Sequence, residues 1–373
     1  MGEGFYIYNV QNISMRRNKS DLSFFKDKDY HAFTALEKAH FISFAPYAFQ
    51  ASVLLRDYGI LHHIQEQSKG LPFESIQEKA SISEYGVRIL LEAGIGIGLL
   101  YEEEGRYFIT KTGSLFITDA MVNINTNFMR DICYEGAGKL KESIEDGKPK
   151  GLPFLGPWKT IYEGLTQLTP LQEKSWFDFD HYYSDHVFPL VMPKVFESNP
   201  TRILDIGANT GKFSLQCLSY NPDIHMNLVD LGKQLDVAKA NLEAKGYDGR
   251  FTMIEHNMLN NHIDLPGTYD VIWMSQFLDC FSDVEIMAIL TKCKKALAPN
   301  GKILINETFW DNQPFHASMY SLQMTSLYFT TIANGNSQMY DSRVFETLIN
   351  KAGLHIVEKE ENIAQTHTLL TLK

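Results

Sequence analysis

The spacing of apolar residues changes near the middle of the chain. Between residues 31 and 67, apolar side chains recur every three or four positions, which predicts helices with a break at Gly59. Two further helices are predicted over 73–79 and 83–93, followed by two short strands within 98–110. Helix, helix and hairpin in this order are typical of a winged-helix unit.

From Thr201 onward, short apolar runs alternate with amphipathic segments. The runs predict strands at 202–207, 225–232, 251–259, 269–279 and 301–310, with helices between them. This alternation predicts a doubly wound, Rossmann-like α/β sheet, and two final strands predict an antiparallel edge hairpin. We therefore expect two domains, a mainly helical winged-helix-like domain over 1–185 and an α/β domain over 186–373.

Composition narrows the function classes. The 373 residues carry 34 Lys and Arg against 45 Asp and Glu, a net charge of -11, which disfavours a protein that tracks nucleic-acid phosphates. The predicted second helix of the winged unit contributes only Arg88, so packing against a protein partner is favoured over DNA binding. Four cysteines without a C-x-x-C motif, no signal peptide and no long apolar run predict a cytoplasmic protein with neither a metal site nor a membrane segment.

The strongest motif is ILDIGANTGKFS at 203–214. A strand runs into a tight turn from Gly207 to Gly211 that opens a helix, and Asp230 ends the next strand. Such a turn brings backbone N–H groups near a ligand, and a strand-end carboxylate suits ribose hydroxyls. The spacing does not fit a P-loop, and Asn209 replaces the middle glycine of a dinucleotide site. The alternative is a packing turn with Asp230 as an incidental acid.

The form D-x-G-x-x-x-G resembles motif I of S-adenosylmethionine (SAM)-dependent methyltransferases. Further segments resemble the caffeate and hydroxyindole type of small-molecule O-methyltransferase: FDHYYSDH (179–186), HNML (256–259), SQFLDCFSDVE (275–285), GKILINE (301–307) and YDSRVFETLINKAGL (340–354). The resemblance implies SAM as cofactor, S-adenosylhomocysteine (SAH) as product, an aromatic or polyketide-like small-molecule acceptor, and a homodimer built through residues 1–140.

The resemblance also implies roles for individual residues. The cofactor would be held by Gly207, Asp230, Asn257, Met258, Ser275, Phe179 and Ser184. Within this set, Gly207 would contact the methionine part, Asp230 the ribose, and Asn257 and Met258 the adenine. Tyr183 and His316 would face the acceptor. His316 is also a candidate base, or else an ordinary surface or packing residue.

The main departure from the family is Asp279, which stands where the family has its catalytic His. An ordinary carboxylate is a much weaker base than imidazole, although burial can raise its pKa. Glu307 matches the acid that orients the family's base, so Asp279 and Glu307 are the catalytic candidates. The alternative is that Asp279 is a capping or solvated loop residue, with Asp283 the better cap of the next helix.

Three mechanisms remain open. Asp279 acts as general base, or an already ionised acceptor needs only proximity and orientation, or the fold performs another task. Methylation of carbon or nitrogen, and a non-catalytic SAM-fold binding or regulatory protein, are the alternative functions. The acceptor pocket is expected between the domains, lined by 128–136, 176–183 and 315–329, although these aromatic and Met-rich segments also suit a core or a dimer interface.

Overall fold

The computed structural model describes residues 32–260 and 262–373, so the first part of the predicted dimerisation segment lies outside the described residues. The chain forms two compact units. The helical unit comprises described residues from 32 to 139 together with Gly151–Tyr183, and the sheet unit comprises Leu140–Lys150 and Ser184–Lys373. The sheet unit therefore includes residues 140–150, which precede the boundary predicted at residue 186.

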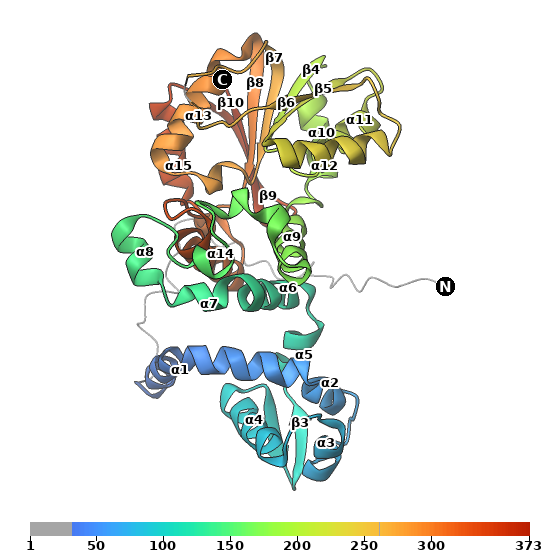
Figure 1. Cartoon of the computed structure of the whole chain (residues 1–373), viewed down its shortest axis with the longest axis vertical. Coiled ribbons are helices and arrows are strands. Elements are labelled where there is room, and N and C mark those ends of the chain that lie inside the picture. The colour runs from blue at the N-terminus through green and yellow to red at the C-terminus, as the bar shows by residue number, and fades with distance from the viewer. Residues whose placement is uncertain (1–31, 261) are drawn as a thin grey trace. The chain divides into compact units, whose positions relative to one another are not determined.

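The helical unit alternates helices with a small sheet (Figure 1). Its elements are α1 (Ala32–Asp57), α2 (Ile60–Gln65), β1 (Leu71–Pro72), α3 (Phe73–Lys79), α4 (Glu84–Ile97), β2 (Leu100–Glu103), β3 (Arg106–Ile109), α5 (Lys111–Thr118), α6 (Ala120–Phe128), the π-helical turn η2 (Met129–Cys133), α7 (Tyr134–Ala137), the 3₁₀ turns η3 (Leu152–Phe154), η4 (Ile161–Glu163) and η5 (Leu165–Gln167), and α9 (Pro170–Ser184). Within the described residues, β1, β3 and β2 form an antiparallel three-stranded sheet.

Local sequence signals explain where these helices begin and end. Gly59 adopts φ 73° and separates α1 from α2, as its position in the apolar pattern predicts. The Ser83 hydroxyl caps α4 by accepting a hydrogen bond from the Gly86 N–H at 3.1 Å. Leu55, Leu61, Val87, Leu91 and other apolar residues form the core of this unit. The predicted helix, helix and hairpin order is confirmed.

The sheet unit is a layered α/β structure (Figure 1). Its elements are α8 (Leu140–Asp146), α10 (Phe188–Phe196), β4 (Arg202–Ile206), α11 (Lys212–Tyr220), β5 (His225–Asp230), α12 (Gly232–Glu243), β6 (Phe251–Glu255), β7 (Tyr269–Ser275), η6 (Leu278–Cys280), α13 (Asp283–Lys295), β8 (Leu297–Glu307), η7 (Trp310–Asn312), α14 (His316–Tyr328), η8 (Phe329–Ala333), α15 (Ser342–Lys351), β9 (Ile356–Ile363) and β10 (His367–Leu372).

Seven strands of the described chain form one sheet in the order β6-β5-β4-β7-β8-β10-β9. The first five are parallel, whereas β10 runs antiparallel to both β8 and β9. The Rossmann-like α/β prediction is confirmed, with a mixed sheet that results from the predicted terminal hairpin. The carboxyl ends of β4, β5, β7 and β8 therefore share one edge of the sheet.

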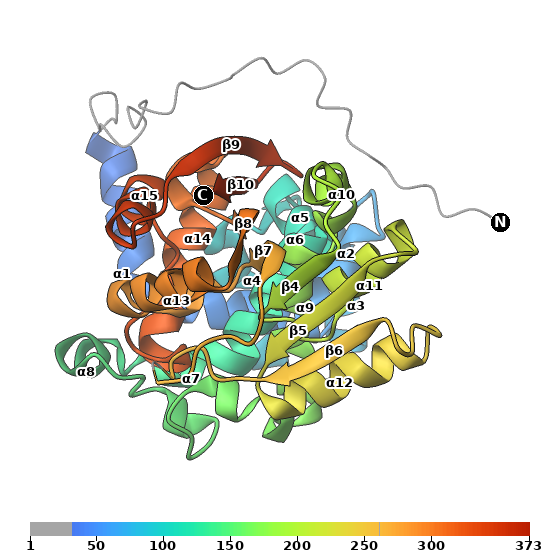
Figure 2. The same ribbon diagram turned by 90° about the horizontal axis from the view of Figure 1, so that it is seen from above.

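Side chains alternate across the sheet and form two apolar layers, because successive strand residues point to opposite faces. Ile203, Trp273 and Leu304 pack with α10, α11 and α12 on one face. Leu204, Met274 and Ile303 pack with α13 and α15 on the other face. Figure 2 shows α13 and α15 on the opposite side of the sheet from α10 and α11.

One local prediction is wrong. Ser282, rather than Asp283, caps α13, because its side chain and Glu285 form a reciprocal capping box. Before the sheet begins, α9 ends at Ser184 and α10 starts at Phe188. In the described part of the chain, no helix is both long enough and apolar enough to cross a membrane.

Candidate cofactor and catalytic site

The turn after β4 has a strained backbone that its sequence explains. Gly207, Asn209 and Gly211 all adopt positive φ, at 74°, 48° and 78°. A side chain at Gly207 would overlap the ring of Phe277, so the turn passes directly against the segment that follows β7. Glycine at 207 is therefore required by both φ and space, and the turn lies buried to half-buried at the carboxyl edge of the sheet.

Asp230 joins this turn to the end of β5. Its Oδ2 accepts a hydrogen bond from the Asn209 N–H at 2.8 Å, and its Oδ1 accepts one from the Leu231 N–H at 2.7 Å. Burial raises the pKa of Asp230 above its ordinary value, while these two hydrogen bonds oppose the shift. A carboxylate has about four acceptor positions, so room remains for the hydroxyls of a ribose.

Asp205 supports the turn from beneath. It lies at 2% exposure in β4, and its Oδ2 accepts a hydrogen bond from the Ser214 hydroxyl of α11 at 2.7 Å. Burial, with the nearby charge of Asp230, raises the pKa of Asp205 to about 7. Its motif position marks Asp205 in the sequence, but its pairing with Ser214 appears only in the fold.

The segment after β6 holds the two residues expected near adenine. Asn257 is exposed, and its Oδ1 accepts a hydrogen bond from the Leu259 N–H at 2.9 Å. Met258 is buried in the core. The His256 N–H donates to the Asp230 carbonyl oxygen at 3.1 Å, which brings this segment beside the end of β5.

The two catalytic candidates lie together at the ends of β7 and β8. Asp279, at 5% exposure in η6, and Glu307, at 2% exposure, are both buried. Oε1 of Glu307 accepts hydrogen bonds from the Phe277 and Leu278 N–H groups at 3.2 and 3.0 Å. Within the described residues, Oε2 of Glu307 has no hydrogen-bond partner. The interpretation of Asp279 as a capping or solvated loop residue is wrong.

Burial and mutual repulsion govern the charge of this pair. Burial raises the pKa of Asp279 to about 6. Burial, followed by the charge of Asp279, raises the pKa of Glu307 well above its ordinary value. Glu307 is thus the group that keeps its proton as the pH rises, and Asp279 is the one that ionises first.

Residues that sequence reasoning missed hold the Asp279 segment. The Asn334 side chain donates to the Cys280 carbonyl oxygen at 2.6 Å, and the Tyr340 hydroxyl lies 2.8 Å from the Phe281 carbonyl oxygen. Nearby, the Asn306 side chain donates to the hydroxyl of Ser275 at 2.9 Å. No sequence signal links Asn334 to residue 280, because the contact spans more than fifty positions.

The other expected site residues are distributed over both units. His316 is exposed as the first residue of α14, with its ring centroid 6.4 Å from that of Tyr320. In the helical unit, Phe179 stacks on Phe128 at 4.0 Å between ring centroids. The side chains of Tyr183 and Ser184 lie outside the described part of the structure.

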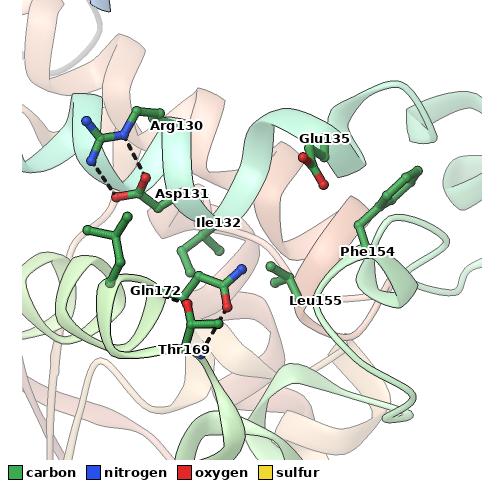
Figure 3. A pocket seen from close by; sticks show the side chains of 9 residues that line it. Arg130, Asp131, Ile132, Glu135, Phe154, Leu155, Thr169 and Gln172 are labelled. Atoms are coloured by element: carbon green, nitrogen blue, oxygen red, sulfur yellow. Dashed lines mark hydrogen bonds and ion pairs between the residues drawn. The ribbon is translucent and has the colours of Figure 1, made fainter. Parts of the chain in front are cut away.

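A cavity of about 240 Å³ lies within the helical unit (Figure 3). It is lined in part by Arg130 and Asp131 of η2 together with Ile132, Phe154, Leu155 and Gln172. The Arg130 guanidinium pairs with Asp131 through two hydrogen bonds of 2.6 and 2.9 Å. Arg130 is therefore paired within the cavity wall, and Glu135 adds a second carboxylate to the lining. Across residues 32–260 and 262–373, no cluster of three or more His, Cys, Asp or Glu side chains is arranged to hold a metal ion.

Comparisons with known proteins find matches to both parts of the chain. Residues 37–107 match a Dimerisation2-like domain and residues 187–355 match an O-methyltransferase domain. L-tyrosine C(3)-methyltransferase of Streptomyces lavendulae is 23% identical over 300 residues, covering 79% of this chain and 80% of that protein. Demethylspheroidene O-methyltransferase of Rhodobacter capsulatus is 23% identical over 327 residues, covering 84% of this chain and 76% of that protein.

Solved structures show the same fold. The mitomycin 7-O-methyltransferase structure aligns with a TM-score of 0.68 at 16% identity, covering 91% of this chain and 98% of that one. An O-methyltransferase from neocarzinostatin biosynthesis was solved with SAM and 2-hydroxy-5-methyl naphthoic acid. It aligns with a TM-score of 0.64 at 18% identity, covering 88% of this chain and 95% of that one.

The fold, with its strand-end turn and acid, defines a class I SAM-dependent methyltransferase, whose methyl donor is SAM and whose donor product is SAH. The chain belongs to the small-molecule O-methyltransferase family, with an N-terminal dimerisation domain.

Proposed function

We propose that this enzyme transfers the methyl group of SAM to a hydroxyl group of an aromatic or polyketide-like small molecule. The observation that carries the proposal is the buried position of Asp279 beside Glu307 at the carboxyl edge of the sheet. A hydroxyl acceptor must lose a proton during transfer, and burial raises the pKa of Asp279 to about 6, which suits a general base near neutral pH. Two relatives whose names specify O-methylation, of a naphthoate and of a flavone, add support.

For the cofactor, we assign the turn at Gly207 to the methionine part and the Asp230 carboxylate to the ribose hydroxyls. Asn257 and Met258 are assigned to the adenine, with Ser275 completing the part of the pocket that lies in the sheet unit. The free acceptor positions on Asp230 support the ribose assignment. The bound cofactor supplies an electrophilic methyl group on its sulfonium.

In the proposed mechanism, Asp279 takes the proton of the acceptor hydroxyl while Glu307 retains its own. Glu307 is held by the backbone N–H groups of Phe277 and Leu278, so it fixes the segment that carries the base. A proton on Glu307 removes like-charge repulsion and leaves Asp279 ionised above pH 6. His316 is proposed to contact the acceptor.

The second candidate function is methylation of an aromatic carbon. It is favoured by the relative that is named a C(3)-methyltransferase of L-tyrosine. A phenol that has lost its proton is nucleophilic at ring carbon as well as at oxygen, so the same base serves both reactions. Orientation of the acceptor then decides the product.

A phenol panel tests both candidates. The chain is incubated with SAM carrying a labelled methyl group and with hydroxynaphthoates, flavones and tyrosine, and mass spectrometry identifies the methylated atom. We expect an O-methyl product, and a product methylated only on carbon would overturn the hydroxyl assignment.

Asp279→Asn should lower kcat by about 10²-fold or more and remove the rise of rate through pH 6. Exposed Asp264→Asn is the control, and equal rates for both variants would remove Asp279 from the mechanism.

We further propose a homodimer built through the helical unit. Large apolar side chains of α1 are exposed, including Phe33, Leu36, Phe44 and Tyr47. A contiguous apolar surface of this kind is typical of a protein interface. The match of residues 37–107 to a dimerisation domain supports a second copy as the partner.

A further inference from the structure

Lys292 is a buried lysine with an unusual set of partners. It lies on α13 at 5% exposure, although lysine is rarely buried without compensating contacts. Its Nζ lies 3.1 Å from Nε2 of His256, 3.0 Å from the Met258 carbonyl oxygen and 2.8 Å from the Asn260 carbonyl oxygen. Three acceptors match the three donors of an ammonium group.

All three acceptors belong to one short segment, residues 256–260, which follows β6 and which we call the 256–260 loop. The first residue of this loop is also hydrogen-bonded to the end of β5, since the backbone N–H of His256 donates to the Asp230 carbonyl oxygen at 3.1 Å. Lys292 orients the backbone of this loop by donating to the carbonyl oxygens of Met258 and Asn260. The loop thus takes its shape from a side chain thirty-two or more positions away.

We propose that Lys292 is a positioning residue for the adenine end of SAM, acting through the 256–260 loop. The inference rests on the proposed assignment of Asn257 and Met258 to the adenine. A buried ammonium bound to three acceptors is expensive to disrupt, because each acceptor left unpaired carries its own desolvation cost. Lys292 therefore holds the loop in one conformation before the cofactor arrives, which lowers the ordering cost of binding.

The arrangement also makes cofactor binding sensitive to acid. His256 accepts a hydrogen bond at Nε2 only while it is neutral, and protonation would turn that acceptor into a donor facing an ammonium. Burial, followed by the charge of Lys292, lowers the pKa of His256, and burial lowers the pKa of Lys292. Asp264, Lys295 and Cys293 are the other groups that act on Lys292. We therefore expect the loop to loosen at a pH below the ordinary pKa of histidine.

Calorimetry with SAH on the full chain tests the proposal. Lys292→Met should weaken SAH binding by about tenfold or more, since it removes three hydrogen bonds from a charged donor. Lys295→Met is the matched control on the same helix, because Lys295 is exposed and pairs only at the surface with Asp264 among the contacts described. The control should bind within about twofold of wild type. SAH binding to Lys292→Met within twofold of wild type would overturn the proposal.

A second variant serves if Lys292→Met fails to fold. His256→Gln keeps an acceptor for Lys292 but does not titrate. Wild type should lose SAH affinity on going from pH 6.5 to pH 5, whereas His256→Gln should lose much less, a difference that a purely structural role would not produce. Equal acid losses in the two proteins would overturn the proposal. A wild-type chain that binds no SAH at pH 7.5 would instead overturn the cofactor site itself.

Discussion

Asp279 illustrates how burial changes the behaviour of a single residue. Its pKa rises from an ordinary 3.8 to about 6 because the folded protein removes it from water. Well below pH 3.8 the carboxyl group is neutral in both the folded and unfolded states. As the pH rises from about 4 through 6, the carboxyl group ionises more readily in the unfolded state than in the folded state. The free energy of unfolding therefore falls over this interval.

Asp279→Asn should therefore stabilise the fold at neutral pH. A shift of about two pKa units corresponds to about 3 kcal/mol of unfolding free energy. We expect the variant to exceed wild type by about 1–3 kcal/mol at pH 7.5 and to match it at pH 3, as measured by urea unfolding. A gain that persists unchanged at pH 3 would contradict the burial explanation. The exposed Asp264→Asn should show no such pH-dependent gain.

Asp230 provides the residue-scale test of the cofactor site. Asp230→Ala removes the acceptors that we propose for the ribose, and it also removes the hydrogen-bond partner of the Asn209 N–H in the turn. SAH affinity should fall by about 30-fold or more, since hydrogen bonds to a charged group are worth about 1.5–3 kcal/mol each. Isothermal titration measures this directly, and Asp223→Ala at an exposed position is the control. Unchanged affinity would remove Asp230 from the site.

At the scale of elements, Gly211 links two helices of the sheet unit. It begins α11 with φ 78°, and an added Cβ would lie 2.7 Å from Cδ1 of Leu242 and 3.2 Å from Cβ of Ala238 on α12. The close approach of α11 to α12 thus depends on the missing side chain. Glycine at position 211 thus meets two requirements, the positive φ before α11 and the close packing of α12.

Gly211→Ala should cost more stability than a matched glycine substitution. Gly246 adopts φ 77° with no atom near its Cβ position, so Gly246→Ala isolates the backbone cost of about 1 kcal/mol. Gly211→Ala adds an overpacking cost of about 1–3 kcal/mol. Thermal or urea unfolding compares the two variants. Equal losses of unfolding free energy would show that α12 shifts to accommodate the added methyl group without a packing penalty.

At the scale of the whole molecule, the proposed homodimer predicts that the exposed apolar side chains of α1 are buried by a second copy. Leu36 and Tyr47 are 55% and 79% exposed, and charging both should oppose their burial by a second copy. We expect wild type to be dimeric by light scattering at micromolar concentration and Leu36→Glu/Tyr47→Glu to be monomeric. Val284→Glu, at a position 72% exposed on α13, is the control. A monomeric wild type would refute the dimer.

Sequence alone determined the two kinds of domain, the helix, helix and hairpin order, the alternating strands and the turn from Gly207 to Gly211. These features depend on local periodicity, on glycine and on capping residues, which act within a few positions. Even here the cap of α13 was missed, because Ser282 and Asp283 are adjacent candidates and only the reciprocal contact with Glu285 distinguishes them.

Tertiary structure alone decided how Asp279, Glu307 and Lys292 behave. Sequence placed Asp279 at a position of interest but left it open between a buried acid and a solvated one. Its burial, the N–H groups that hold Glu307 and the loop that Lys292 holds all arise from contacts between distant segments. Charge and proton affinity depend on which groups surround a side chain in space, and periodicity along the chain carries no such information.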